Sequence, residues 1–310
     1  MEIQTENGLK EVFSYLETGN PDKARRIVEH LLETDLTGNE IVFTSTCCNY
    51  WSSISYHILE IDDPFERGEN LLSEWKSFKS YINRQKYVYM PTVHAIQKGI
   101  FTIALQNYMQ VIDEKDATHK SEICRKAGLC YKKLGSFENA RRCLAEANSL
   151  FPNQASVLAD LADCYALCGE DKGAKVLFRE AFFLDPQKID LEFLDSELIK
   201  CLIEKIQEKG FSGTAMQMWL PVYGVLWGVF NIKRELRSQE VGKLRQDIYA
   251  LENEQKDPSC DLEIITPRLI NMYFWLIDHY IQHNDDQKLI NEILLKIKIL
   301  DTNIYNLYIR

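Results

Sequence analysis

The chain repeats itself with a period of 34 residues. Residues 121–154 and 155–188 match each other at this offset, and a fixed period of this length is typical of stacked helical hairpins. The matching pairs are Gly128 with Ala162, Tyr131 with Tyr165, Gly135 with Gly169, Ala140 with Ala174, Ala147 with Ala181, Leu150 with Leu184, and Pro152 with Pro186. The period predicts two consecutive helix-turn-helix units.

Each repeated position in this pattern has a physical reason. Small side chains at Gly128, Ala140, Ala162 and Ala174 let the two helices of a hairpin approach closely. Gly135 and Gly169 can end the first helix of each unit in a left-handed conformation that costs glycine little. Ser136 is placed to cap the second helix of the first unit. Pro152 and Pro186 stop the second helix of each unit.

The segment resembles the tetratricopeptide repeat family, whose pattern is a large residue, Leu-Gly, Tyr, Ala, Phe, Ala and Pro. The first copy carries Cys124, Ala127, Gly128, Tyr131, Ala140, Leu144, Ala147 and Pro152. The second copy carries Leu158, Leu161, Ala162, Tyr165, Ala174, Phe178, Ala181 and Pro186. The resemblance covers about a fifth of the chain. It implies an all-α superhelix of antiparallel helix hairpins that binds another protein or a peptide segment and has no catalytic residues.

Apolar residues recur at helical spacing along the rest of the chain, without an alternating strand pattern. We therefore expect an N-terminal helical region with degenerate hairpins over residues 1–120, the two repeats over 121–188, and a C-terminal helical region over 189–310. Asp63, Pro64 and Glu66 predict a capped helix start, and Gly19 and Pro21 predict a short turn between two helices. Further helices are expected over 39–61, 92–113, 189–208, 214–232, 233–256, 266–283 and 287–299. Residues 256–259 are a candidate linker, and the apolar end at 304–308 is expected to dock on the last hairpin.

The composition of the chain indicates which partners the protein can bind and in which compartment it works. The chain has 310 residues, of which 45% are hydrophobic, and a formal net charge of −10, which opposes general nucleic-acid binding. The chain has nine cysteines, an odd number that does not favour a framework of paired disulfides. Several of them lie where a helical core would place a small apolar residue. They are Cys124, Cys130, Cys143, Cys164 and Cys201. Residues 1–6 lack the pattern of a secretory signal. We therefore expect a reducing, cytoplasmic location.

Residues 214–232 are uncharged and apolar, which raises the question of a membrane span. Gly224 and Gly228 have the spacing of a membrane dimer motif. Gln217 and Pro221 oppose that interpretation and favour a buried repeat helix that begins near Pro221. An alternative function is a helical small-molecule or metal-binding protein, with an apolar pocket lined by the aromatic residues near 214–230. Membrane-associated assembly is a third hypothesis.

The sequence offers few other candidates for chemistry. His279 and His283 are four residues apart on a predicted helix and could both reach one metal ion, but no third ligand is in phase with them. The cysteines form no CxxC pair, and neither a phosphate-binding glycine loop nor a nucleophile elbow occurs. We therefore predict no metal, no cofactor and no catalytic residues.

In the tetratricopeptide repeat family, the first helix of each repeat lines the inner groove. Carried over, this implies a partner-binding groove formed by Glu122, Arg125, Leu129, Lys132, Lys133, Ser156, Ala159, Asp163, Ala166 and Leu167. Arg125, Lys132 and Lys133 would make a basic spot on an acidic chain and would suit an acidic partner segment. The alternative is that all of these are ordinary helix surface residues. Leu129 and Asp163 depart from the family's clamp for a C-terminal carboxylate, so we do not predict binding of chaperone tails. The oligomeric state stays open.

Overall fold

The computed structural model describes residues 3–34 and 38–310, and the described residues are helical without any β-strand. The predicted all-α helical-repeat class is therefore confirmed. The chain divides into two compact units, Met1–Pro152 and Asn153–Arg310, which we call unit 1 and unit 2. The division falls between the two repeats, so each repeat is described within its own unit. Met1 and Glu2, part of the N-terminal segment considered above, lie outside the described residues.

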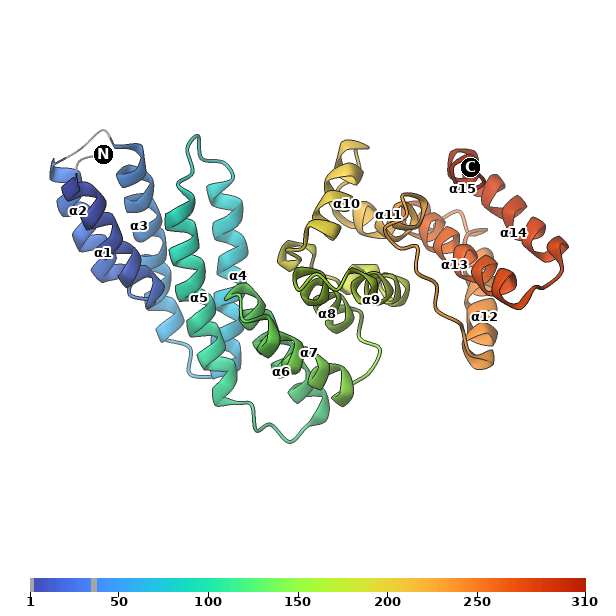
Figure 1. Ribbon diagram of the computed structural model, residues 1–310, viewed down its shortest axis with the longest axis horizontal. Coiled ribbons are helices and arrows are strands. Elements are labelled where there is room, and N and C mark those ends of the chain that lie inside the picture. Colours follow the sequence, from blue (N-terminus) through green and yellow to red (C-terminus); the bar gives the residue numbers. More distant parts are fainter. Residues whose placement is uncertain (1–2, 35–37) are drawn as a thin grey trace. The chain divides into compact units, whose positions relative to one another are not determined.

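Unit 1 is a series of seven described helices in which neighbours along the chain pack together (Figure 1). They are α1 (Ile3–Glu17), α2 (Pro21–Thr34), α3 (Asn39–Leu59), α4 (Pro64–Ile82), α5 (Met90–Gln110), α6 (Ala117–Lys133) and α7 (Phe137–Leu150). Helix α1 also packs against α5, so the unit is closed by a contact between helices far apart in sequence.

Local sequence signals set the helix ends in unit 1 as predicted. Gly19 follows α1 with φ +73°, in the left-handed region that glycine tolerates. Pro21 opens α2, where its missing N–H costs nothing. The Asp63 side chain accepts a hydrogen bond of 2.8 Å from the backbone N–H of Glu66, and Pro64 is the first residue of α4. The predicted cap at Asp63 is confirmed.

Aromatic side chains form the centre of unit 1. Trp51 from α3, Phe78 from α4 and Phe101 from α5 are almost completely buried. The ring centroids of Trp51 and Phe78 are 5.4 Å apart, and those of Trp75 and Phe101 are 5.5 Å apart, both in edge-on arrangements. Such edge-to-face pairs are favoured by the ring quadrupoles. Truncating one of these rings to alanine would cost roughly 3–5 kcal/mol.

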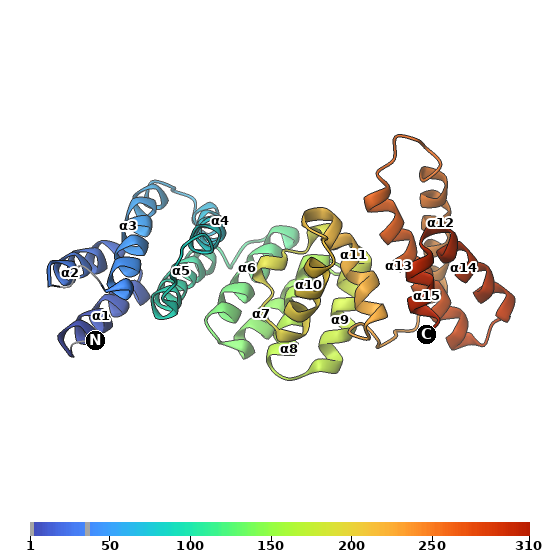
Figure 2. The ribbon, with the colours of Figure 1, turned by 90° about the horizontal axis from the view of Figure 1, so that it is seen from above.

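Unit 2 contains eight α-helices and two short 3₁₀ turns (Figure 2). They are α8 (Ala155–Leu167), α9 (Asp171–Leu184), η1 (Pro186–Lys188), η2 (Leu191–Phe193), α10 (Glu197–Glu208), α11 (Gly213–Leu226), α12 (Ser238–Glu254), α13 (Leu262–His283), α14 (Gln287–Leu300) and α15 (Thr302–Tyr308). Helix α13 is the central element, because it packs against α11, α12 and α14. The rings of Phe274 and Tyr308 stack with centroids 4.4 Å apart, which confirms that the C-terminal end docks on the last hairpin.

The structure differs from the predicted helices in three places of unit 2. The expected helix over 189–208 begins only at Glu197, after the two 3₁₀ turns. The expected helix near Pro221 begins instead at Gly213 and includes Pro221, which is buried. Residues 231–237 are not helical but extended, and α12 starts at Ser238. The expected linker over 256–259 is a turn between the packed helices α12 and α13.

Candidate functional site

In the first repeat, α6 and α7 pack closely at Gly128. A Cβ atom on Gly128 would lie 2.7 Å from Cγ of Leu144, which is itself fully buried. The Ser121 hydroxyl donates a hydrogen bond of 2.8 Å to the carbonyl oxygen of Ala147, on the same seam. Gly135 follows α6 in the left-handed region, with φ +76°. Ala140 and Ala147 are fully buried, Tyr131 is half-buried and Pro152 is exposed just after α7.

In the second repeat, α8 and α9 use the corresponding positions in the same way. Gly169 follows α8 with φ +79°. Pro186 ends the repeat, and it is buried at the start of η1. The small residues Ala162, Ala174 and Ala181 are fully buried, and Tyr165 is half-buried.

Ser136 occupies the N-cap position of α7, but its side chain does not cap the helix. Its hydroxyl oxygen instead accepts a hydrogen bond of 3.0 Å from Nδ2 of Asn139. The predicted capping hydrogen bond of Ser136 is therefore wrong.

The face of α6 predicted to bind a partner carries a tight ion pair. Arg125 donates from Nε to Glu122 Oε2 over 2.8 Å and from Nη2 to Glu122 Oε1 over 2.5 Å. The Arg125 side chain is only 12% exposed and that of Glu122 is 32% exposed. Burial alone would raise the pKa of Glu122, but the hydrogen bonds and charge of Arg125, with help from Lys126, outweigh it and lower the pKa. The charge of Arg125 is thus balanced within the helix.

The ion pair continues into neighbouring helices through residues that the sequence prediction missed. Lys126 Nζ lies 2.6 Å from Glu69 Oε2 of α4. The Tyr108 hydroxyl of α5 donates a hydrogen bond of 2.6 Å to the other oxygen of Glu69, and burial, followed by the charge of Glu69, raises the pKa of Tyr108. Glu69 and Lys126 are 57 residues apart, so no local pattern could have paired them.

The remaining predicted groove residues of α6 are mostly covered. Leu129 is buried, and Lys132 is only 3% exposed. Lys133 is half-buried, and its carbonyl oxygen accepts a hydrogen bond of 3.0 Å from Nε2 of Gln97 on α5. The predicted basic spot is therefore less accessible than its composition implies, because long cationic side chains pack along the helix surface.

On α8, Asp163 holds the chain ahead of α10 and is not a surface residue. Its side chain is fully buried. Its two carboxylate oxygens accept hydrogen bonds of 2.9 Å and 2.8 Å from the backbone N–H groups of Asp195 and Ser196. The expectation that Asp163 faces a partner is corrected by these bonds, since a buried carboxylate is retained where backbone donors satisfy it. Ala159 is also buried, whereas Ser156, Ala166 and Leu167 are half-buried.

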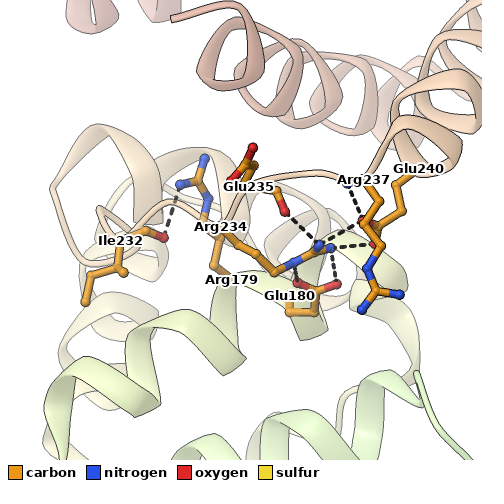
Figure 3. A network of polar contacts seen from close by, with 7 residues as sticks. All are labelled: Arg179, Glu180, Ile232, Arg234, Glu235, Arg237 and Glu240. Carbon is orange, nitrogen blue, oxygen red and sulfur yellow. Dashed lines mark hydrogen bonds and ion pairs between the residues drawn. The ribbon is translucent and has the colours of Figure 1, made fainter. Parts of the chain in front are cut away.

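A second polar network fixes the extended segment 231–237 to the second repeat (Figure 3). Arg234 makes paired hydrogen bonds of 2.7 and 2.9 Å to Glu180 of α9, and two of 3.0 Å to Glu240 of α12. These hydrogen bonds raise the pKa of Arg234 further. The backbone N–H of Arg237 also donates to Glu240, over 2.7 Å. The side chain of Arg234 therefore binds within unit 2, where the sequence had predicted a helix over residues 233–256.

Next to this network lies a buried ion pair. Arg179 of α9 forms an ion pair with Asp278 of α13, and Lys233 Nζ lies 2.5 Å from the other oxygen of Asp278. Arg179 also donates to the carbonyl oxygen of Ile232, over 3.3 Å, and its guanidinium lies 4.9 Å from the ring centroid of Trp275. Both Arg179 and Asp278 are buried. This cluster ties α9, α13 and the extended segment together.

The aromatic residues near 214–230 form a stack along α11. The ring centroids of Trp219 and Tyr223 are 5.9 Å apart, and those of Tyr223 and Trp227 are 4.8 Å apart. Phe211 joins the stack at 5.4 Å from Trp219, and Lys209 Nζ lies 5.2 Å from the centre of the Tyr223 ring. Trp227, at the end of this aromatic stack, lines a surface depression together with residues of α10.

The rings of His279 and His283 lie close together, with centroids 4.2 Å apart. Among the described residues, no three His, Cys, Asp or Glu side chains gather so that they could hold a metal ion. Burial, followed by the nearby His283, lowers the pKa of His279. Within the same described residues, no helix combines the length and the apolar character that crossing a membrane requires.

A comparison with protein-family models matches the first repeat. Residues 121–154 match the family model described as tetratricopeptide repeat, and these residues contain all of α7 and all but the first four residues of α6. No curated protein matches the chain.

Proposed function

Starting from a chain that contains a tetratricopeptide repeat within an all-α helical-repeat fold, we propose that this protein is an interaction scaffold that binds another protein. The observation that carries the proposal is the hairpin of α6 and α7, which has the close seam of the repeat at Gly128 and a half-exposed polar face on its first helix. Helical-repeat proteins bury a continuous seam and use the surface left over for extended contacts with partners.

We propose that the contact face consists of the predicted groove residues of unit 1 that are at least partly exposed. They are Glu122, Arg125 and Lys133 on α6, whereas Ser156, Ala166 and Leu167 on α8 belong to unit 2 and stay a separate prediction. Leu129 and Lys132 then act as the packed wall beneath this face. An acidic partner segment would have to compete with Glu122 for Arg125, so charge would set the specificity and the rate of binding more than its strength.

We further propose that the chain has no catalytic role and works in a reducing compartment such as the cytoplasm. All nine cysteines are free thiols, and Cys47, Cys48, Cys124, Cys130 and Cys164 are buried. Burial raises the pKa of Cys48 to about 12 and that of Cys124 to about 11. Cysteines with raised pKa values behave as small core residues and not as nucleophiles.

Affinity purification of the tagged full chain from its native cells, with quantitative mass spectrometry, tests the scaffold. The variant Arg125→Glu places a like charge beside Glu122, and the double variant Glu122→Arg with Arg125→Glu restores the pair in reverse. The exposed pair of Glu6 and Lys10 on α1, whose Nζ–Oε1 distance is 2.8 Å, supplies the control Lys10→Glu. We expect Arg125→Glu and the double variant to lose the same partners, and Lys10→Glu to keep them.

The variant Glu122→Gln tests the charge of the partner separately, because it removes one negative charge from the proposed face and nearly keeps the size of the side chain. An acidic partner would bind Glu122→Gln more tightly, and a basic one more weakly. Circular dichroism and the unfolding temperature show whether each variant is folded. Identical partner profiles for the parent chain and folded Arg125→Glu would contradict the proposed face.

A further inference from the structure

Unit 1 contains a cleft of about 270 Å³ among its first five helices. Its apolar walls come from Leu16, Ile54, Ile58, Leu71, Ile96 and Ile100. An apolar cavity of about 150 Å³ is large enough for a benzene molecule, and sites for drug-sized ligands begin at about 300 Å³. The cleft therefore has room for a small molecule with a short chain or a single ring.

The cleft is also lined by polar side chains, among them that of Arg67 on α4. The guanidinium is held in place from two sides. Nε and Nη2 donate hydrogen bonds of 3.0 and 2.6 Å to the carbonyl oxygen of Ile61, and Nη1 donates one of 3.2 Å to Oδ1 of Asn107. Asn107 is itself buried and fixed, because its Nδ2 donates a hydrogen bond of 2.9 Å to the carbonyl oxygen of Ile103.

Arg67 differs from the other arginines discussed above in having no acidic partner. Arg125, Arg179 and Arg234 each form an ion pair with a carboxylate, whereas Arg67 is bound by neutral oxygens alone within the described part of the chain. These bonds do not use every N–H donor of the guanidinium. A half-buried cation of fixed orientation, beside apolar walls, is complementary to a carboxylate that carries an apolar body.

A second observation points in the same direction. Trp51 lines the cleft, is 1% exposed, and its indole N–H has no hydrogen-bond partner among the described residues. An unsatisfied buried donor is uncommon in folded proteins and costs stability. An oxygen atom of a bound ligand would provide the acceptor that this N–H lacks.

We propose that this cleft binds a small amphipathic carboxylate. Its apolar part lies against Ile54, Ile58 and Ile100, and its carboxylate lies at Arg67. Asn107 is a positioning residue that fixes Arg67. The site lies within unit 1 and does not depend on the proposed protein-binding face.

Titration calorimetry on the full chain tests the proposal with three probes. Octanoate has both the apolar chain and the carboxylate, 1-octanol lacks the charge, and acetate lacks the chain. We expect saturable binding of octanoate, with binding of both other probes weaker by about tenfold or more, since a hydrogen bond to a charged group is worth about this factor. No binding of octanoate, or equal binding of 1-octanol, would overturn the proposal.

Two variants place the binding in this cleft. Ile54→Trp fills the cleft from its half-exposed wall and should abolish octanoate binding, whereas Val42→Trp places the same side chain on an exposed position of the same helix, away from the cleft, and should leave binding unchanged. Arg67→Gln should weaken octanoate binding by about tenfold and leave that of 1-octanol unchanged. Equal binding of octanoate by folded Ile54→Trp and Val42→Trp would overturn the assignment, even if Arg67→Gln proved too unstable to measure.

Discussion

In the first repeat, the ion pair of Glu122 and Arg125 lies on one helix and remains partly exposed. In the second repeat, the prominent charged groups lie inside unit 2. Asp163 binds the backbone ahead of α10, and Arg179 pairs with Asp278 of α13. The two repeats have small residues at the same positions and a left-handed glycine after the first helix, so the helices of each hairpin pack in the same way.

The comparison shows which residues the repeat pattern determines and which residues can differ from one repeat to the next. Small residues, glycines and prolines determine how two helices meet, and they recur at the offset of 34 residues. Polar residues between them are free to differ, and here those of the second repeat stabilise the fold of unit 2. We therefore infer that a polar contact face lies on the first repeat, within unit 1. Four predictions test this difference, from the largest expected effect to the smallest.

The variant Asp278→Ala should have the largest effect. It leaves Arg179 buried without its carboxylate, and breaking a buried ion pair in this way costs about 3–5 kcal/mol. The matched variant Glu122→Ala in the first repeat should cost about 1 kcal/mol or less, because its pair is partly exposed. Urea unfolding of both variants, followed by circular dichroism, measures the two costs. Equal losses would remove the distinction between the repeats.

The variant Asp163→Ala should lower the free energy of unfolding by about 2–3 kcal/mol, since the buried N–H group of Ser196 and the partly buried N–H group of Asp195 lose a charged acceptor. Asp163→Asn keeps one acceptor oxygen and should lose less. Hydrogen exchange should report faster exchange at the amides of Asp195 and Ser196 in Asp163→Ala. If these amides stay protected, Asp163 is not what holds the segment before α10.

Much of the fold could be predicted because its signals are local. The helical period, the cap at Asp63 and the glycine at position 19 each act within one turn of a helix. The prediction failed at residues 231–237, where Leu236 and Val241 continue a helical spacing but the segment is extended. Its conformation depends on Arg234 and Glu180, which are 54 residues apart, and such a contact leaves no periodic trace.

The same limit applies to the proposed contact face. The spacing of Glu122 and Arg125 by three residues is favourable for an ion pair on a helix, so that pair could have been found from sequence. The bond of Asp163 to Ser196 joins residues 33 apart, and only the packing of α8 against α10 brings them together. A family pattern therefore identifies which helix lines a groove, but tertiary packing decides which of its side chains are accessible.

Exchanging the small residues of the two repeats should give a smaller effect. Gly128→Ala places a methyl group 2.7 Å from Cγ of Leu144, and overpacking of a core costs about 1–3 kcal/mol, partly offset by about 1 kcal/mol of helix propensity. Ala162→Gly in the second repeat should cost about 1 kcal/mol through helix propensity, and about 0.8 kcal/mol more through loss of a buried methyl group. We expect both variants to unfold at lower temperature. A stabilised Gly128→Ala would mean that Leu144 can move aside.

The loss of folding stability that the Glu122–Arg125 ion pair causes at acid pH should be the smallest of the four effects. The folded-state pKa of Glu122 is lowered from its ordinary value of 4.5, so the unfolded chain takes up a proton first as the pH falls. The contribution of this ion pair to stability is therefore present above about pH 4.5 and is lost as the pH falls through the folded-state pKa, with a size below about 1 kcal/mol for a partly exposed pair. Glu122→Gln should remove this dependence, which urea titrations from pH 7 to pH 3 can measure against the exposed control Glu11→Gln on α1. An unchanged slope in Glu122→Gln would show that the pair with Arg125 does not persist in solution, and would weaken the case for a polar contact face on α6.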